Sequence, residues 1–85
     1  MADMLLIMKV YPEEPGMEHA IEEKLKKLKH GRVQETRIEP IAFGLCLVKM
    51  AVIVPDEAGS VEAVEKDIKG MAGVKDVEVE GMTLL

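Results

Sequence analysis

The side chains of this 85-residue chain that could take part in chemistry are few and scattered. The only cysteine, Cys46, stands in an apolar run, and the two histidines, His19 and His30, are far apart in the sequence. Zinc sites need clustered cysteine or histidine ligands, and a thiol nucleophile needs a neighbouring base. Cys46 is therefore predicted to be buried and unreactive, and we expect no metal, no cofactor and no enzymatic activity.

A second candidate for chemistry is the stretch from Gly31 to Gln34, which is similar to the start of the acylphosphatase phosphate loop. In that family the stretch follows the first strand and continues through another glycine to an essential arginine. Here it follows a helical pattern and continues into Glu35 and Thr36. A four-residue match is weak evidence for a shared activity. We interpret the match as coincidental, and an acylphosphatase-like enzyme is the least favoured alternative.

The most distinctive feature is a corner formed by residues 39–45, where the only phenylalanine, Phe43, lies between Pro40 and Gly44. Proline removes a backbone donor from a sheet, and glycine permits a tight turn. The pattern leaves two interpretations open. Phe43 either caps one end of the hydrophobic core or is presented to a partner, because aromatic side chains often carry much of the energy of an interface.

The composition indicates a single domain over residues 1–85, with 48% hydrophobic and 32% charged residues. No apolar run approaches the roughly 18 residues of a membrane span. A net charge of −5 disfavours direct binding to nucleic acid, whose phosphates attract cations. The first three residues lack the features of a secretory signal, so we expect a cytoplasmic protein. The basic residues between Lys24 and Arg32 are interpreted as a solvated helix end.

The first half of the chain is predicted to form a strand, a helix and a second strand. Residues 4–11 are almost entirely apolar, which is typical of a central strand. Apolar residues then recur every three or four positions over residues 17–28, a helical period, and His30 and Gly31 are expected to end this helix. Residues 33–38 have mixed polarity, which indicates a strand at the edge of a sheet.

The second half repeats the same order of elements. Residues 45–54 form the most apolar run of the chain and are predicted to be a strand. A second helix is expected to begin with Ser60 as its cap and to end at Gly70 or Gly73. Residues 74–80 nearly alternate between valine and charged side chains, so they are predicted to form the last strand.

This order predicts an α+β fold, the βαββαβ ferredoxin-like sandwich, in which two helices cover one face of a four-stranded antiparallel sheet. Many unrelated functions share this fold, so the fold does not decide the function. One alternative is a small-ligand-binding regulatory module that dimerises through its sheet. Gly16 and Gly59, each before a predicted helix, would be its weak ligand-binding candidates.

The whole chain resembles archaeal elongation factor 1-beta, which corresponds to the exchange domain of the eukaryotic factor. The stretches that carry the resemblance are Pro40-Ile41-Ala42-Phe43-Gly44-Leu45, Val10-Tyr11-Pro12, Asp56-Glu57-Ala58-Gly59 and Gly73-Val74-Lys75-Asp76-Val77-Glu78-Val79. Only the first of these is distinctive by itself. The resemblance implies a guanine-nucleotide exchange factor whose partner is the GTPase elongation factor 1-alpha, which delivers aminoacyl-tRNA.

The resemblance also implies which residues bind the partner. They are Pro40, Ile41, Ala42, Phe43, Gly44, Thr83, Leu84 and Leu85. In the eukaryotic factors a loop aromatic inserts into the GTPase, and a lysine next to the C-terminus disturbs its magnesium and phosphate site. Phe43 stands at the aromatic position, but Leu84 stands where the lysine would be. Two alternatives follow: the tail contributes apolar contacts and a terminal carboxylate, or exchange depends on Phe43 and on movement of the GTPase switches alone.

Overall fold

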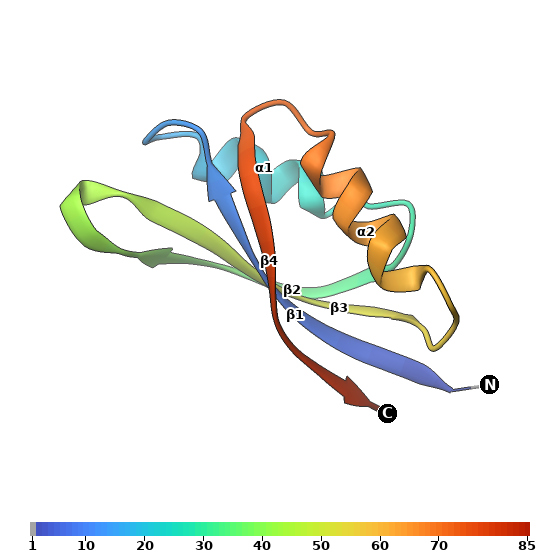
Figure 1. Cartoon of the computed structure of the whole chain (residues 1–85). Helices are drawn as coiled ribbons and strands as arrows, with labels where there is room; N and C mark the ends of the chain where they lie inside the picture. Colours follow the sequence, from blue (N-terminus) through green and yellow to red (C-terminus); the bar gives the residue numbers. More distant parts are fainter. Residues whose placement is uncertain (1) are drawn as a thin grey trace.

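The protein, described over residues 2–85 by a computed structural model, consists of one four-stranded sheet and two helices (Figure 1). The elements are β1 (Asp3–Pro12), α1 (Glu18–Leu25), β2 (Arg32–Pro40), the short 3₁₀ turn η1 (Ala42–Gly44), β3 (Cys46–Pro55), α2 (Ser60–Lys69) and β4 (Val74–Leu84). The predicted α+β ferredoxin-like sandwich is therefore confirmed.

The sheet has the strand order β2-β3-β1-β4, and every neighbouring pair is antiparallel. β1 lies in the centre of the sheet and β2 at an edge, as predicted. The most apolar strand, β3, is the other central strand, and β4 forms the other edge. Leu6 lies opposite Val52, and Met8 lies opposite Met50, so these four buried side chains share one face. The alternation of side chains along a strand leaves the residues between them on the other face.

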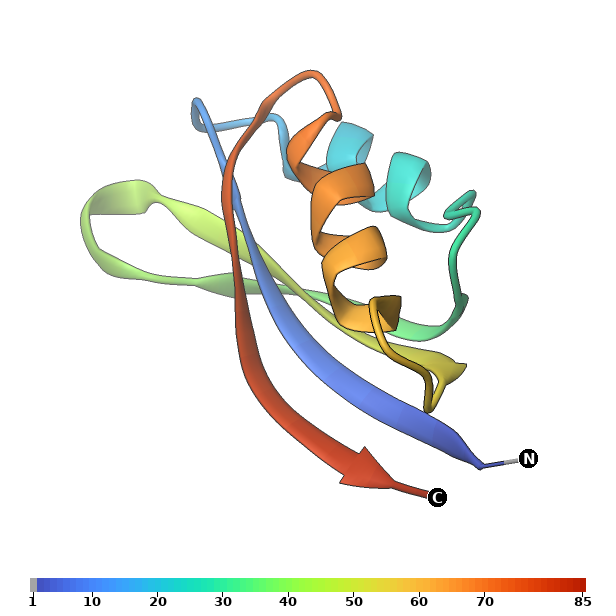
Figure 2. The same ribbon diagram turned by 45° about the vertical axis from the view of Figure 1, so that its right-hand side comes forward.

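Both helices cover the same face of the sheet, and within residues 2–85 no helix covers the other face (Figure 2). Ile21 and Leu25 of α1 and Val64 and Ile68 of α2 are fully buried against the strands. Burying one such aliphatic side chain stabilises the fold by about 1.5–3 kcal/mol. Among residues 2–85 the buried core is therefore one layer of aliphatic and methionine side chains between the helices and the sheet, and it contains no aromatic ring.

The first helix is shorter than predicted. It ends at Leu25, and the backbone N–H of Leu28 donates to the carbonyl of Leu25 in a tight turn. Leu28 still packs against the core, so the apolar spacing continues after the helix has ended. Gly31 is not a helix cap either. A Cβ atom added there would lie 2.8 Å from Cγ2 of Val52, so Gly31 allows the chain to pass close to β3.

The second helix begins differently from the prediction and ends as predicted. Its N-cap is Gly59, in a left-handed conformation at φ 86°, and Ser60 is the first helical residue and provides no capping hydrogen bond. Glycine takes this conformation without a steric penalty, which allows the sharp entry into the helix. The helix ends at Gly70, one of the two glycines predicted to end it.

Candidate functional site

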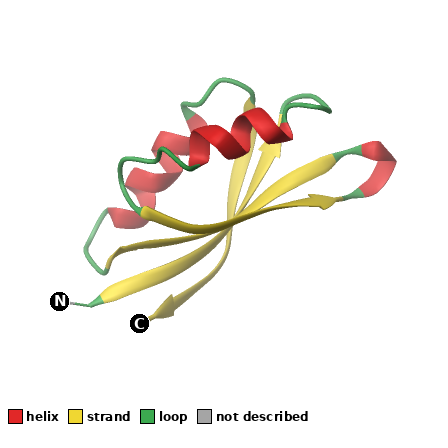
Figure 3. Ribbon diagram, turned by 180° about the vertical axis from the view of Figure 1, so that it is seen from behind, coloured by secondary structure: helices red, strands yellow, loops and turns green. Residues whose placement is uncertain are grey.

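The predicted corner is the tip of the hairpin that joins β2 to β3. β2 ends at Pro40, which lies opposite Cys46 at the start of β3. The backbone N–H of Ile41 donates to the carbonyl of Leu45 at 2.8 Å, and that of Leu45 donates to the carbonyl of Ala42 at 3.2 Å. These bonds close the tip into η1, which lies at the end of the sheet and away from both helices (Figure 3). Cys46, predicted to be buried, is only half-buried.

Phe43 projects from this tip into solvent. Its exposed fraction is 98%, so the ring does not cap the core. Its backbone has φ 60° and ψ 35°, the left-handed conformation, and it is the only non-glycine residue with positive φ among residues 2–85. This conformation costs an L-residue about 1–2 kcal/mol. A phenylalanine that is both strained and unburied is not explained by stability, and such outliers cluster at functional sites.

Two apolar neighbours accompany Phe43 at the tip. Ile41 and Leu45 are both partly exposed, and they flank the turn that carries the ring. Leu45 was not among the predicted partner-binding residues, because it stood at the start of an apolar run that was predicted to be a buried strand. The sequence feature that could have identified Leu45 as a partner-binding residue is its position directly after Gly44, at the end of the corner. Together, Ile41, Phe43 and Leu45 form what we call the tip cluster.

The last strand is longer than predicted and includes the predicted tail residues. β4 continues past Glu80 to Leu84, because a bulge at Glu80 lets the chain resume pairing with the first half of β1. Thr83 lies opposite Leu5, and Leu84 lies opposite Met4. The backbone N–H of Leu85 donates to the carbonyl of Asp3 at 2.9 Å. The tail is therefore held in the sheet.

The side chains at the end of β4 form a second exposed apolar group. Met82, Leu84 and Leu85 have exposed fractions of 60%, 65% and 64%, and we call them the tail cluster. Met82 and Leu84 point to the helix side of the sheet, as their partners on β1 do, but this part of β4 curves away from the helices (Figure 1). Met82 was missed by the sequence prediction, which ended the strand before it.

The tip cluster and the tail cluster lie at opposite ends of the sheet. Cys46 begins β3 beside the tip, whereas Val54 near its end lies opposite Met4, the residue that also pairs with Leu84. Eight residues of strand therefore separate the two clusters, about 26 Å at about 3.3 Å per residue. The structure thus brings Pro40, Ile41, Ala42, Phe43 and Gly44 together and holds Thr83, Leu84 and Leu85 apart from them.

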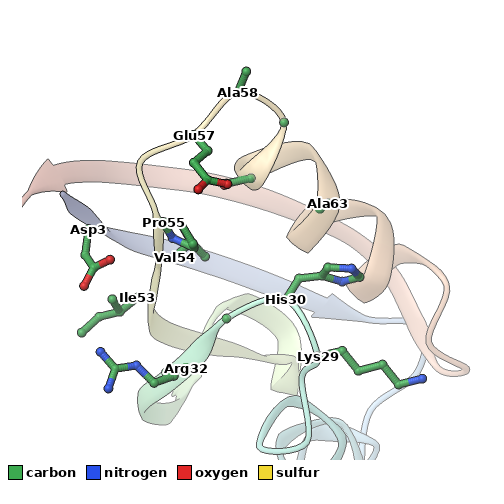
Figure 4. A pocket seen from close by; sticks show the side chains of 13 residues that line it. Asp3, Lys29, His30, Arg32, Ile53, Val54, Pro55, Glu57, Ala58 and Ala63 are labelled. Carbon is green, nitrogen blue, oxygen red and sulfur yellow. The ribbon is translucent and has the colours of Figure 1, made fainter. Parts of the chain in front are cut away.

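A cavity of about 570 Å³ lies between the start of α2 and the loop before β2. In Figure 4 the side chains of Lys29 and Arg32 extend in opposite directions, and the carboxylates of Asp3 and Glu57 belong to the same lining. His30 faces α2, with its Nδ1 2.5 Å from an Oδ of Asp67. The charges in this cavity are mixed and do not converge on one point, so it does not form a phosphate cradle.

Nearly the whole chain matches a known protein family. Residues 5–85 match the family model described as the EF-1 guanine nucleotide exchange domain. The chain belongs to this family. Both clusters lie within the matched part of this exchange domain. The role of the family is nucleotide exchange on elongation factor 1, which requires binding and no bond making by the exchange domain.

Curated relatives support the same assignment over nearly the whole chain. A protein named elongation factor 1-beta from Methanospirillum hungatei is 40% identical over 85 residues, which is 100% of both chains. A protein of the same name from Methanothermobacter thermautotrophicus is 39% identical, and the match covers 93% of this chain and 92% of that protein. Another from Ignicoccus hospitalis is 38% identical, and the match covers 94% of this chain and 89% of that protein. The exchange domain is therefore similar to archaeal elongation factor 1-beta over its whole length. Among residues 2–85, no helix is long and apolar enough to cross a membrane.

Proposed function

We propose that this protein is a cytoplasmic guanine-nucleotide exchange factor that promotes release of GDP from the GTPase elongation factor 1-alpha, so that GTP can bind. The observation that carries the proposal is the exposure of Phe43 at a strained position of the hairpin tip. The ring stabilises nothing in its own fold, and a pocket of the GTPase would bury it. Aromatic side chains that fill a partner's pocket are typical hot spots of protein interfaces.

The proposed mechanism is thermodynamic. A factor that binds the nucleotide-free GTPase more tightly than the loaded form must weaken nucleotide binding by the same factor. Each tenfold loss of nucleotide affinity requires about 1.4 kcal/mol of this coupling. An aromatic hot spot contributes on the order of 2–4 kcal/mol to a complex. If Phe43 can insert only into the nucleotide-free conformation of the GTPase, its insertion would therefore lower the affinity of the GTPase for GDP by one to three powers of ten.

The tail cluster would supply the second contact. Leu84 carries no charge, so it cannot act on the magnesium site of the GTPase as a lysine would. Its side chain is instead exposed beside Met82, on a strand paired with β1. This arrangement favours the first of the two alternatives for the tail, in which it contributes apolar contact. The contact would orient the factor while Phe43 enters the GTPase at the other end.

The proposal is tested by release of fluorescent GDP from an archaeal elongation factor 1-alpha. The wild-type chain is expected to accelerate release, and Phe43→Ala is expected to lose most of this acceleration. Glu62→Ala, which truncates an exposed residue of α2 far from the tip, is the control and is expected to behave like the wild type. If the wild-type chain does not accelerate release at any concentration, the proposal is wrong.

A further inference from the structure

A β-bulge in β4 sets the direction of the tail cluster. Val79 lies opposite Met8 of β1, and Gly81 lies opposite the residue before it, Ile7. Glu80 is therefore an extra residue without a partner on β1. A bulge of this kind bends its strand and re-aims the side chains that follow it. Beyond Glu80, β4 curves away from the helices and carries the tail cluster with it (Figure 1).

The side chain of Glu80 is in contact with a lysine two strands away. Lys49 Nζ lies 3.0 Å from one Oε of Glu80 and 3.4 Å from the other. Lys49 belongs to β3, and β1 lies between β3 and β4, so the two side chains meet across a whole strand. Among the ion pairs within residues 2–85, this is the only one that joins two strands.

The charges around Lys49 favour this contact over others on the same face. Lys9 of β1 and Arg37 of β2 lie directly opposite Lys49 on its two sides, and like charges in such positions repel each other. Arg37 contacts a carboxylate of its own strand at 3.7 Å, and Glu78 of β4 lies directly opposite Lys9. The neighbouring cations and carboxylates are thus matched with each other, and Glu80 is the carboxylate that meets Lys49.

We propose that the ion pair between Lys49 and Glu80 positions the tail cluster for the proposed exchange reaction. β4 is an edge strand, so β1 is its only neighbour in the sheet, and the bulge interrupts the pairing with β1. The ion pair ties the bulge to β3 as well, and β3 begins at the hairpin tip. The inference rests on the proposed function and makes Lys49 and Glu80 positioning residues, which act through the tail and need no contact with the GTPase.

The test neutralises each partner with a side chain of similar size, in Glu80→Gln and Lys49→Met. The control is Glu78→Gln, the same change on the same strand at a residue that forms no ion pair within residues 2–85. The first readout is hydrogen exchange of the Leu85 amide, which donates to the carbonyl of Asp3 and reports on the tail without the GTPase. Because exposed ion pairs are weak, this exchange is expected to be about two- to fivefold faster in both test variants and unchanged in the control.

The second readout is GDP release from elongation factor 1-alpha at a limiting concentration of the factor. Glu80→Gln and Lys49→Met should each slow release about two- to fivefold. The double variant should be no slower than either single variant, because each substitution removes the same ion pair. In a Leu84→Ser background, Glu80→Gln should have no further effect, because the contact that the ion pair positions has already been lost. Glu78→Gln should match the wild type.

Thermal unfolding of each variant separates loosening of the tail from loss of the whole fold. Unchanged hydrogen exchange at Leu85 in both test variants would overturn the inference, and so would additive losses in the double variant or in the Leu84→Ser background. Faster hydrogen exchange with unaltered GDP release would also overturn it. In each of these cases the proposed function stands as long as the wild type accelerates GDP release, whereas no acceleration by the wild type would overturn both.

Discussion

Substitution of Phe43 should separate stability from function, because the exposed ring contributes almost nothing to the stability of the fold and serves only the proposed partner. The exposed fraction of 98% leaves about 2% of the ring surface buried. With about 200 Å² for the side chain and about 25 cal/mol per Å², truncation to alanine removes only about 0.1 kcal/mol of burial. Phe43→Ala is therefore expected to leave the free energy of unfolding unchanged.

Phe43→Gly should even raise the free energy of unfolding. Glycine removes the penalty of about 1–2 kcal/mol that an L-residue meets at φ 60°. It also adds about 0.5–1 kcal/mol of chain entropy to the unfolded state, which works against folding. The net change is a gain between about 0 and 1.5 kcal/mol, obtained by subtracting these two ranges. The same variant should lose about 2–4 kcal/mol of binding to the nucleotide-free GTPase.

The assay pairs urea unfolding of the two variants with their stimulation of GDP release. The expected result is unchanged or increased stability together with a large loss of exchange. A loss of more than about 1 kcal/mol in Phe43→Ala would refute the reasoning, because a residue with so little burial lacks any mechanism for it. Full exchange activity in both variants would refute the role of the ring and leave the tail cluster as the main contact.

Three further predictions concern the rest of the fold and the tail. Gly31→Ala should destabilise the fold by about 1–3 kcal/mol, because the added methyl group would overpack against β3. Gly81→Ala, where the space around the glycine is open, should instead stabilise the fold by about 0.4–1 kcal/mol. Equal urea midpoints for these two variants would contradict both expectations. Thr36→Val removes the 2.8 Å hydrogen bond that the Thr36 hydroxyl donates to Glu22, which should cost about 1–2 kcal/mol in thermal unfolding and leave exchange intact. Leu84→Ser should change stability by less than about 0.5 kcal/mol but slow GDP release about tenfold; unchanged release would exclude a tail contact.

Local sequence pattern predicted the elements and the fold but not where two of the elements end. The helix period continues to Leu28 because that residue still packs against the core after the backbone has turned. Gly31 looked like a helix cap, but its role depends on Val52 of β3, which is distant in sequence. β4 extends to Leu84 only because the start of β1 lies beside it, and no pattern within residues 80–85 contains that information.

The candidate site was predictable where it depended on residue types and unpredictable where it depended on coverage by other elements. The proline, the glycine and the single ring marked the hairpin tip, and the strained conformation of Phe43 appeared only in the structure. Leu45 and Met82 look like core residues in the sequence. They are exposed because the tip extends beyond the helices and the end of β4 curves away from them. Burial at these positions is decided by tertiary arrangement and not by hydrophobicity.

The distance between the tip cluster and the tail cluster constrains how the proposed exchange reaction can work. Two contacts about 26 Å apart reinforce each other only if the chain between them is stiff, because a flexible connection lowers the effective concentration of the second contact. β1 and β3 supply this stiffness, since they pair continuously from Asp3 opposite Pro55 to Val10 opposite Val48. A GTPase held at both clusters could admit Phe43 only in the conformation that matches this fixed spacing. The rigid sheet would then allow contact at both clusters only in the nucleotide-free state of the GTPase. Contact at the tail cluster would therefore favour that state and weaken the binding of GDP.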